Sequence, residues 1–78
     1  MSLEKKEIVT IGELSKLSGL PTSTIRYYCD RGILTPEFIG GRRTFRREEV
    51  MKKITRILEL KNKGFMLSQI KEILEKEE

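Results

Sequence analysis

Side chains that can bind nucleic acid recur at helical spacing within residues 19–34, GLPTSTIRYYCDRGIL. At 100° per residue, Ser23, Arg26 and Tyr27 fall on one side of a helix. A hydroxyl, a guanidinium and a phenol form hydrogen bonds with phosphate oxygens and with the edges of bases. The other side carries residues that can join a core: Ile25, Tyr28 and Cys29. The stretch therefore predicts a DNA recognition helix, meaning the helix that enters a groove of duplex DNA.

Both ends of this helix carry turn signals. Pro21 suits the first helical turn, where its missing N–H would be unpaired anyway, and Gly32 suits the position just after the last turn. Arg26 also has an alternative role, because Asp30 stands four residues later and could form a surface ion pair with it.

The residue types that most catalytic and metal sites need are scarce. The chain has one cysteine and no histidine, so an internal disulfide, a Cys/His metal site within one chain, and Ser-His or Cys-His catalytic pairs are excluded. The carboxylates stand mostly in lysine-rich helical segments, as on a solvated face. We therefore expect no catalytic residue, no metal and no cofactor, hence no enzyme, and we expect Cys29 to be a small core residue.

Positive charge is concentrated in the middle of the chain. The net charge is +4, and residues 21–56 alone hold nine basic and four acidic side chains. A localised excess favours an anionic partner such as double-stranded DNA over a general effect on solubility. No apolar run approaches the ~20 residues that span a membrane, and no signal peptide opens the chain, so we expect a cytoplasmic protein.

A second helix is predicted ahead of the recognition helix. Thr10 to Glu13 form a capping-box pattern, apolar residues then repeat at helical spacing, and Gly19 ends the segment. The predicted helix covers residues 11–18 and is joined to the recognition helix by a tight turn. Two short helices joined in this way are typical of a helix-turn-helix.

Residues 35–46, TPEFIGGRRTFR, predict a β-hairpin. Gly40-Gly41 supplies the positive φ that a two-residue turn requires, and Phe38, Ile39 and the residues after the turn can form its strands. Four arginines surround the turn: Arg42, Arg43, Arg46 and Arg47. We expect a wing that grips phosphates, the alternative being a loop whose arginines serve only solubility.

Two further helices are predicted, from about 47 to 63 and from about 67 to the end. The first carries an apolar stripe of Val50, Ile54, Ile57 and Leu58 and ends before Gly64. Phe65 is expected to pack at the corner between the two helices. We expect one domain over residues 8–78, preceded by a flexible tail over residues 1–7.

Residues 9–74 resemble the DNA-binding domain of the MerR family of transcriptional regulators. The segments that carry the resemblance are Ile11-Gly12-Glu13-Leu14, Ser18-Gly19-Leu20, Thr24-Ile25-Arg26-Tyr27-Tyr28, Gly32-Ile33-Leu34, Gly41-Arg42-Arg43-Thr44-Phe45, Gly64-Phe65 and Ile70-Lys71-Glu72-Ile73-Leu74. Each segment is weak by itself, but their order and spacing are specific together. The resemblance implies a mainly α winged helix-turn-helix, with four helices and a small β-hairpin wing between the second and third helices.

The resemblance also implies roles for individual residues. Arg26 and Tyr27 are expected to contact DNA, and Arg43 corresponds to the family's arginine that grips the DNA backbone. Thr22 and Ser23 lie at the N-terminus of the recognition helix, where side chains commonly reach bases.

Several positions depart from the family pattern. Cys29 replaces an acidic residue, whereas Arg46 and Met66 replace the helix-capping residues common before the third and fourth helices. The long helix that pairs with a dimer mate is missing, as is the effector-binding region, so no small-molecule effector is assigned. The chain is then either a fragment of a larger regulator or a stand-alone protein.

The expected function is sequence-specific binding of double-stranded DNA by a MerR-type transcriptional regulator associated with the bacterial nucleoid. The alternatives are an excisionase-like factor that bends DNA and, less favoured, a helical module that binds an acidic protein. A homodimer or oligomer on DNA is the other partnership that the resemblance allows. Without the pairing helix, the isolated chain is expected to be monomeric in dilute solution and weak on DNA.

Overall fold

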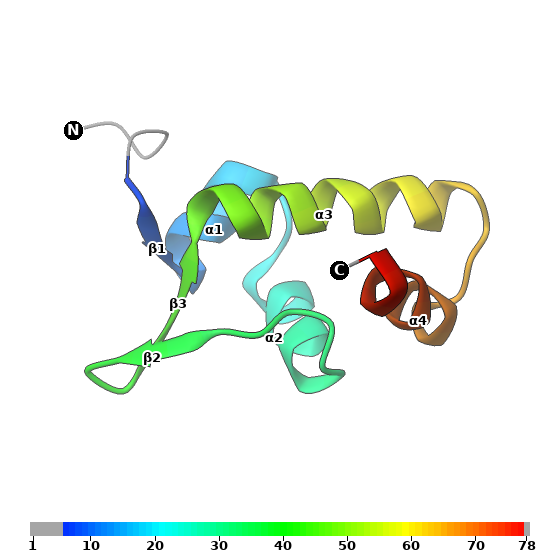
Figure 1. Cartoon of the computed structure of the whole chain (residues 1–78). Helices are drawn as coiled ribbons and strands as arrows, with labels where there is room; N and C mark the ends of the chain where they lie inside the picture. The colour runs from blue at the N-terminus through cyan, green and yellow to red at the C-terminus, as the bar shows by residue number, and fades with distance from the viewer. Residues whose placement is uncertain (1–5, 78) are drawn as a thin grey trace.

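The computed structural model describes residues 6–77. Its elements are β1 (Ile8–Thr10), α1 (Ile11–Ser18), α2 (Thr22–Asp30), β2 (Glu37–Ile39), β3 (Arg42–Arg46), α3 (Arg47–Asn62) and α4 (Leu67–Glu77). The predicted fold class is confirmed: the chain is a mainly α winged helix-turn-helix with four helices and the hairpin between α2 and α3. In Figure 1, α3 lies across the molecule, α4 turns back beneath its C-terminal half, and the β2–β3 hairpin projects from the body.

Residues 1–5 of the predicted N-terminal tail lie outside the described residues, whereas Lys6 and Glu7 make contacts with the domain. The carbonyl of Lys6 accepts a hydrogen bond from Arg47 Nε at 2.7 Å, and the carbonyl of Glu7 accepts one from Arg47 N at 2.8 Å. The Lys6 ammonium donates to Glu13 Oε2 at 2.6 Å and holds the pKa of that carboxyl below its usual value. These bonds join the start of the chain to α1 and α3.

The predicted capping box of α1 is confirmed. Thr10 Oγ1 accepts from the Glu13 N–H at 3.2 Å, and Glu13 Oε1 accepts from the Thr10 N–H at 3.0 Å. These two bonds satisfy donors that the first turn of a helix leaves without intrahelical partners. Gly19 ends the helix in the left-handed region, with φ of 77°.

The predicted recognition helix is α2, and it begins one residue later than predicted. Pro21 was expected within the first turn but lies directly before it. Pro21 is the N-cap, with an extended ψ of 149°, and its carbonyl accepts from the N–H groups of Thr24 and Ile25. At the other end, Gly32 takes the expected position, with φ of 76°. The Gly32 N–H donates to Cys29 O at 3.0 Å, and the following N–H donates to Tyr28 O at 2.9 Å, which is the Schellman pattern.

The predicted hairpin is confirmed, and a third strand extends it. Gly40 and Gly41 have φ of 58° and 77°, as a type I′ turn requires, and the strand order is β1-β3-β2. Strand β1 was not predicted from the sequence, because three residues are too few for a period-2 pattern. It pairs antiparallel with β3 through Ile8↔Arg46, Val9↔Phe45 and Thr10↔Thr44.

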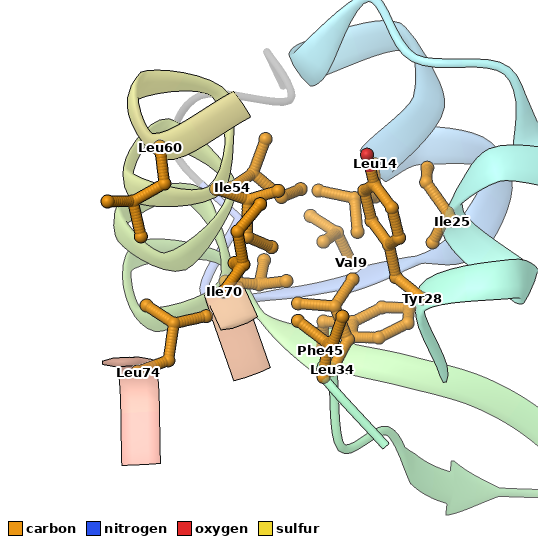
Figure 2. Close-up of a cluster of buried hydrophobic side chains, with 13 residues drawn as sticks. Val9, Leu14, Ile25, Tyr28, Leu34, Phe45, Ile54, Leu60, Ile70 and Leu74 are labelled. Atoms are coloured by element: carbon orange, nitrogen blue, oxygen red, sulfur yellow. The ribbon is translucent and has the colours of Figure 1, made fainter. Parts of the chain in front are cut away.

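One core joins every layer of the domain (Figure 2). Its buried members include Val9 of β1, Leu14 of α1, Ile25 of α2, Phe45 of β3 and Ile70 of α4. Together with four buried residues of α3 they come from six elements, so removing any one of these elements would expose apolar side chains of the others. This shared core fixes α2 relative to the wing.

The predicted stripe of α3 is wrong at one edge. Val50, Ile54 and Ile57 are buried, but Leu58 is exposed and Leu60 is buried in its place. At 100° per residue, Leu58 and Leu60 lie about 80° to either side of Val50. Helical periodicity therefore treats the two as equivalent, and the chain after Leu60 decides between them, because α4 contributes Ile70 and Leu74 to the same core.

Candidate nucleic-acid interface

The two faces of α2 have the predicted orientation. Ile25 is fully buried and Tyr28 is 2% exposed, whereas Tyr27 is 51% exposed. Ser23 and Arg26 are exposed beside Tyr27, and Thr22 is half-buried at the N-terminus of the helix. In Figure 2 the Tyr28 ring points from α2 into the apolar cluster. The polar groups of α2 are thus presented outward from a helix that the core holds in place.

Cys29 lies at the edge between these faces. Its thiol is half-buried and packs against the core, as expected for a small core residue. Burial raises the pKa of the thiol, while the nearby Arg43 guanidinium opposes this shift. The sulfur is therefore protonated at neutral pH and is a poor nucleophile.

A hollow of about 560 Å³ lies between α2 and the wing. The guanidinium-bearing residues that line it are Arg26 from α2 and Arg42 and Arg43 from β3. Its remaining lining residues are Thr10, Ile11, Gly12, Phe38 and Gly41. Three arginines from two elements separated in sequence are therefore brought together around one concave surface, which we call the arginine hollow.

Arg43 has an ion-pair partner within the fold. Its Nη2 lies 3.7 Å from Asp30 Oδ1 at the end of α2, with 31% and 68% of the two side chains exposed. Such a partly exposed pair contributes only about 0–1 kcal/mol. The pairing predicted as an alternative for Arg26 is thus absent: Asp30 meets Arg43, and among residues 6–77 the Arg26 guanidinium has no hydrogen bond or ion pair.

The other two arginines of the predicted cluster lie elsewhere. Arg46 is 3.7 Å from Glu37 and lines a separate hollow of about 630 Å³ against α3 and α4, and no side chain caps α3 there. Arg47 holds the N-terminal segment through the carbonyl of Lys6. Alternate residues of a strand point to opposite faces, so Arg43 and Arg46 diverge. The sequence spacing could not show which arginines would share a surface.

A second hollow, of about 420 Å³, lies on the other flank of α2. Ser23 and Tyr27 line it from α2, and Lys61 and Phe65 line it from the α3–α4 corner. Phe65 lies at that corner, where it was predicted to pack, and keeps 39% of its surface exposed beside α2. Sequence reasoning missed Lys61 as a neighbour of this surface; Gly64, which ends α3, was the signal that the chain turns back there.

Arg31 was also missed. Its guanidinium carbon lies 5.9 Å from the centroid of the Tyr27 ring, within the range of a cation–π contact. This contact leaves the outward orientation of Tyr27 unchanged and adds a further positive charge beside it. The signal available in the sequence was that Arg31 stands four residues after Tyr27, the spacing at which side chains on one helix face meet.

Two other classes of feature are absent from the described part of the chain. Within residues 6–77, no helix is long and apolar enough to cross a membrane. In the same span, no group of three or more His, Cys, Asp or Glu side chains is arranged to hold a metal ion.

The chain is similar to known proteins over most of its length. Residues 9–77 match the model of the MerR HTH family regulatory proteins. The HTH-type transcriptional regulator HmrR of Rhizobium leguminosarum bv. viciae is 37% identical over 67 residues, covering 85% of this chain and 51% of that protein. The HTH-type transcriptional regulator CueR of Bacillus subtilis (strain 168) is 32% identical over 73 residues, covering 94% of this chain and 51% of that protein. The chain thus spans about half the length of these curated relatives, and no solved structure matches it significantly.

Proposed function

The chain belongs to the MerR HTH family of regulatory proteins, and from that membership we propose that it binds double-stranded DNA in a sequence-specific manner as part of transcriptional regulation. One observation carries the proposal: Arg26, Arg42 and Arg43 meet around the arginine hollow beside an exposed Tyr27. Convergent guanidinium groups on a concave surface suit phosphates and guanine edges. No chemical step is part of the proposed role.

The recognition helix α2 would lie in the major groove, which is about 12 Å wide and admits one helix. Arg26 then reads a base edge, since its guanidinium is exposed and unpaired within the described chain. Tyr27 would donate its hydroxyl beside it, and Thr22 and Ser23 would meet the DNA at the N-terminus of α2. These four residues are the proposed base-reading set.

The wing would position the domain on the backbone. Arg42 and Arg43 line the same hollow as Arg26, so a phosphate there would lie between the helix and the wing. For Arg43, a phosphate would compete with the exposed carboxylate of Asp30, and the 3.7 Å separation is longer than a charge-assisted hydrogen bond. Contact of DNA with Arg46 stays a prediction and would be made from outside the arginine hollow.

The α3–α4 corner supports the opposite flank. Lys61 and Phe65 face the same hollow as Ser23 and Tyr27, so a duplex seated on α2 would run between this corner and the wing. We further propose that two copies bind two half-sites about one helical turn apart, in the bacterial cytoplasm. The proposal covers the DNA-binding half of such a regulator and no effector.

A selection from a random duplex library tests the proposal. The 78-residue chain should enrich a defined motif, and its affinity should fall linearly with salt on a log–log scale, with a slope of about −0.9 per neutralised phosphate. Arg26→Ala should relax the enriched motif at one base position, whereas Lys76→Ala, which removes one charge from α4 away from the hollow, should leave the motif unchanged. A chain that binds no duplex at low salt, or binds without any enriched motif, would contradict sequence-specific DNA binding.

A further inference from the structure

The wing exposes two apolar side chains on its first strand. Phe38 is 65% exposed and Ile39 is 53% exposed, on a hairpin that projects from the body (Figure 1). Neither belongs to the core, whose β-sheet members are Val9 and Phe45. An exposed aromatic ring on a projecting hairpin does not stabilise the fold by burial, and it is available for contact with a partner.

The strand register separates these two residues. Phe38 pairs with Arg43 and Ile39 pairs with Arg42, and directly opposite residues of an antiparallel pair share a face of the sheet. Arg43 and Phe45 are two residues apart on β3 and therefore point to the same face, which is the face toward the core and α2. Phe38 therefore lies on the side of the wing that faces α2, whereas Ile39 and Arg42 start from the opposite side of their strands. Arg42, directly after the two-glycine turn, nevertheless lines the arginine hollow, and Ile39 does not.

Phe38 also lines the arginine hollow, whereas Ile39 is not among its lining residues. Phe38 thus lines one concave surface together with Arg26, Arg42 and Arg43. The hairpin that holds it is short and closed by a two-glycine turn, and Thr44 Oγ1 donates to Glu37 O at 2.9 Å directly before Phe38. The position of the backbone that carries the ring is therefore set before any partner arrives.

We propose that Phe38 is an apolar DNA contact, whose ring packs against the deoxyribose sugars of the backbone strand that the wing arginines grip. This inference rests on the proposed function. Phosphates match the arginines, and the sugar between two phosphates is the apolar part of the same strand, so one stretch of backbone satisfies both kinds of group. Arginines on the same wall favour this polyanionic occupant over an apolar protein surface, which would leave them unpaired.

An apolar contact has a signature that an ionic contact lacks. Packing of a ring against a sugar releases no counterion, so it adds affinity without changing the slope of log affinity against log salt. It also carries no base information, so its loss affects all sequences similarly. Arg42, in the same hollow, should show the opposite behaviour in its salt slope.

The test compares wild type, Phe38→Ala, Phe38→Gln, Ile39→Ala and Arg42→Ala, using fluorescence anisotropy on a mixed-sequence duplex and on the duplex enriched by selection. Phe38→Ala should lower affinity about tenfold on both duplexes with the wild-type salt slope. Phe38→Gln, which keeps the length of the side chain but not its apolar character, should show a similar loss. Ile39→Ala should bind as wild type, and Arg42→Ala should make the slope shallower.

The melting temperature of each variant is measured beside the titrations. If Phe38→Ala has a lowered melting temperature, the affinity of Phe38→Gln is used to test the contact instead. Wild-type affinity in both Phe38 variants would overturn this contact alone, while leaving the proposed function intact. A salt slope reduced as in Arg42→Ala, or an equal loss in Ile39→Ala, would also overturn it. A wild-type chain that binds neither duplex would overturn the proposed function, and this contact with it.

Discussion

The two faces of α2 place the same residue type in opposite settings. Tyr27 and Tyr28 are sequence neighbours with rings 6.4 Å apart between centroids, yet one is 51% exposed and the other is 2% exposed. A helical step of 100° suffices to move a side chain from the exposed surface into the core. The same mutation at these two positions should therefore register in different experiments, as lost affinity on one face and as changed stability on the other.

The faces also differ in how their polar groups are satisfied. Within the described residues, the Arg26 guanidinium on the outer face has no partner but is solvated. On the inner face, the buried Tyr28 hydroxyl has no hydrogen-bond partner among residues 6–77. An unpaired polar group is inexpensive in water and costs about 1–3 kcal/mol when buried. The outer face can thus remain open for a ligand, whereas the unpaired Tyr28 hydroxyl on the inner face lowers the stability of the fold.

The largest effect is expected for Tyr28→Ala, which should lower the free energy of unfolding by about 3–5 kcal/mol, because it truncates an aromatic ring inside the core. Urea denaturation monitored by circular dichroism measures this change. Tyr27→Ala is the matched control and should change stability far less. Equal losses in the free energy of unfolding of the two variants would contradict the placement of Tyr28 in the core and Tyr27 on the surface.

Arg26→Ala should weaken DNA binding by about 1–3 kcal/mol if the guanidinium reads a guanine edge. The melting temperature should stay close to wild type, since the side chain has no partner in the described fold to lose. Titration against the enriched duplex and single-base variants of it would show relaxed specificity at one position. A uniform loss across all sequences would instead assign Arg26 to a phosphate.

Removing the hydroxyl group from each tyrosine in turn sharpens the comparison. Tyr27→Phe should leave stability unchanged and weaken DNA binding by about 1 kcal/mol, the worth of a typical hydrogen bond. Tyr28→Phe should leave binding unchanged and raise the free energy of unfolding by about 1 kcal/mol, since it removes a buried group without a partner in the described chain. The reverse pattern would show that α2 is rotated relative to this structure.

Arg43→Ala tests the wing against its ion pair. Loss of the pair with Asp30 should change stability by less than about 1 kcal/mol, because both groups are partly exposed. Loss of a phosphate contact should make the salt slope shallower by about 0.9 on target and unrelated duplexes alike. Asp30→Asn is the control, since it removes the ion pair and keeps the guanidinium. An unchanged salt slope in Arg43→Ala would assign the residue to the fold alone.

Cys29→Ala should have the smallest effect, a loss of about 1 kcal/mol or less for a half-buried sulfur. Burial raises the pKa of the thiol above its ordinary value of 9.0, so the folded state favours the neutral form. Its contribution to stability is then complete below pH 9.0 and is lost as the pH rises through the folded-state value. As the pH rises through that value, the free energy of unfolding should fall less steeply in Cys29→Ala than in wild type. Identical pH dependence in the two proteins would show that the thiol does not contribute to it.

Local signals in the sequence determined the ends of the elements and the facing of α2. The capping box at Thr10, the glycines that end α1 and α2, and the two-glycine turn of the wing each act through backbone geometry within a few residues. The division between Tyr27 and Tyr28 follows from helical periodicity alone. Neighbours along the chain suffice for such features, so they could be predicted together with the outward-facing polar side of α2.

Tertiary structure decided the contacts between elements. Pairing of β1 with β3, burial of Leu60 rather than Leu58, and the choice of Arg43 as the partner of Asp30 each join residues that lie far apart or that periodicity treats alike. The same holds for the arginine hollow, which Arg26, Arg42 and Arg43 line while Arg46 lines a different hollow. Helical or strand periodicity in the sequence predicts which residues share a face of one element, but only the packing of elements around a common core determines which faces meet.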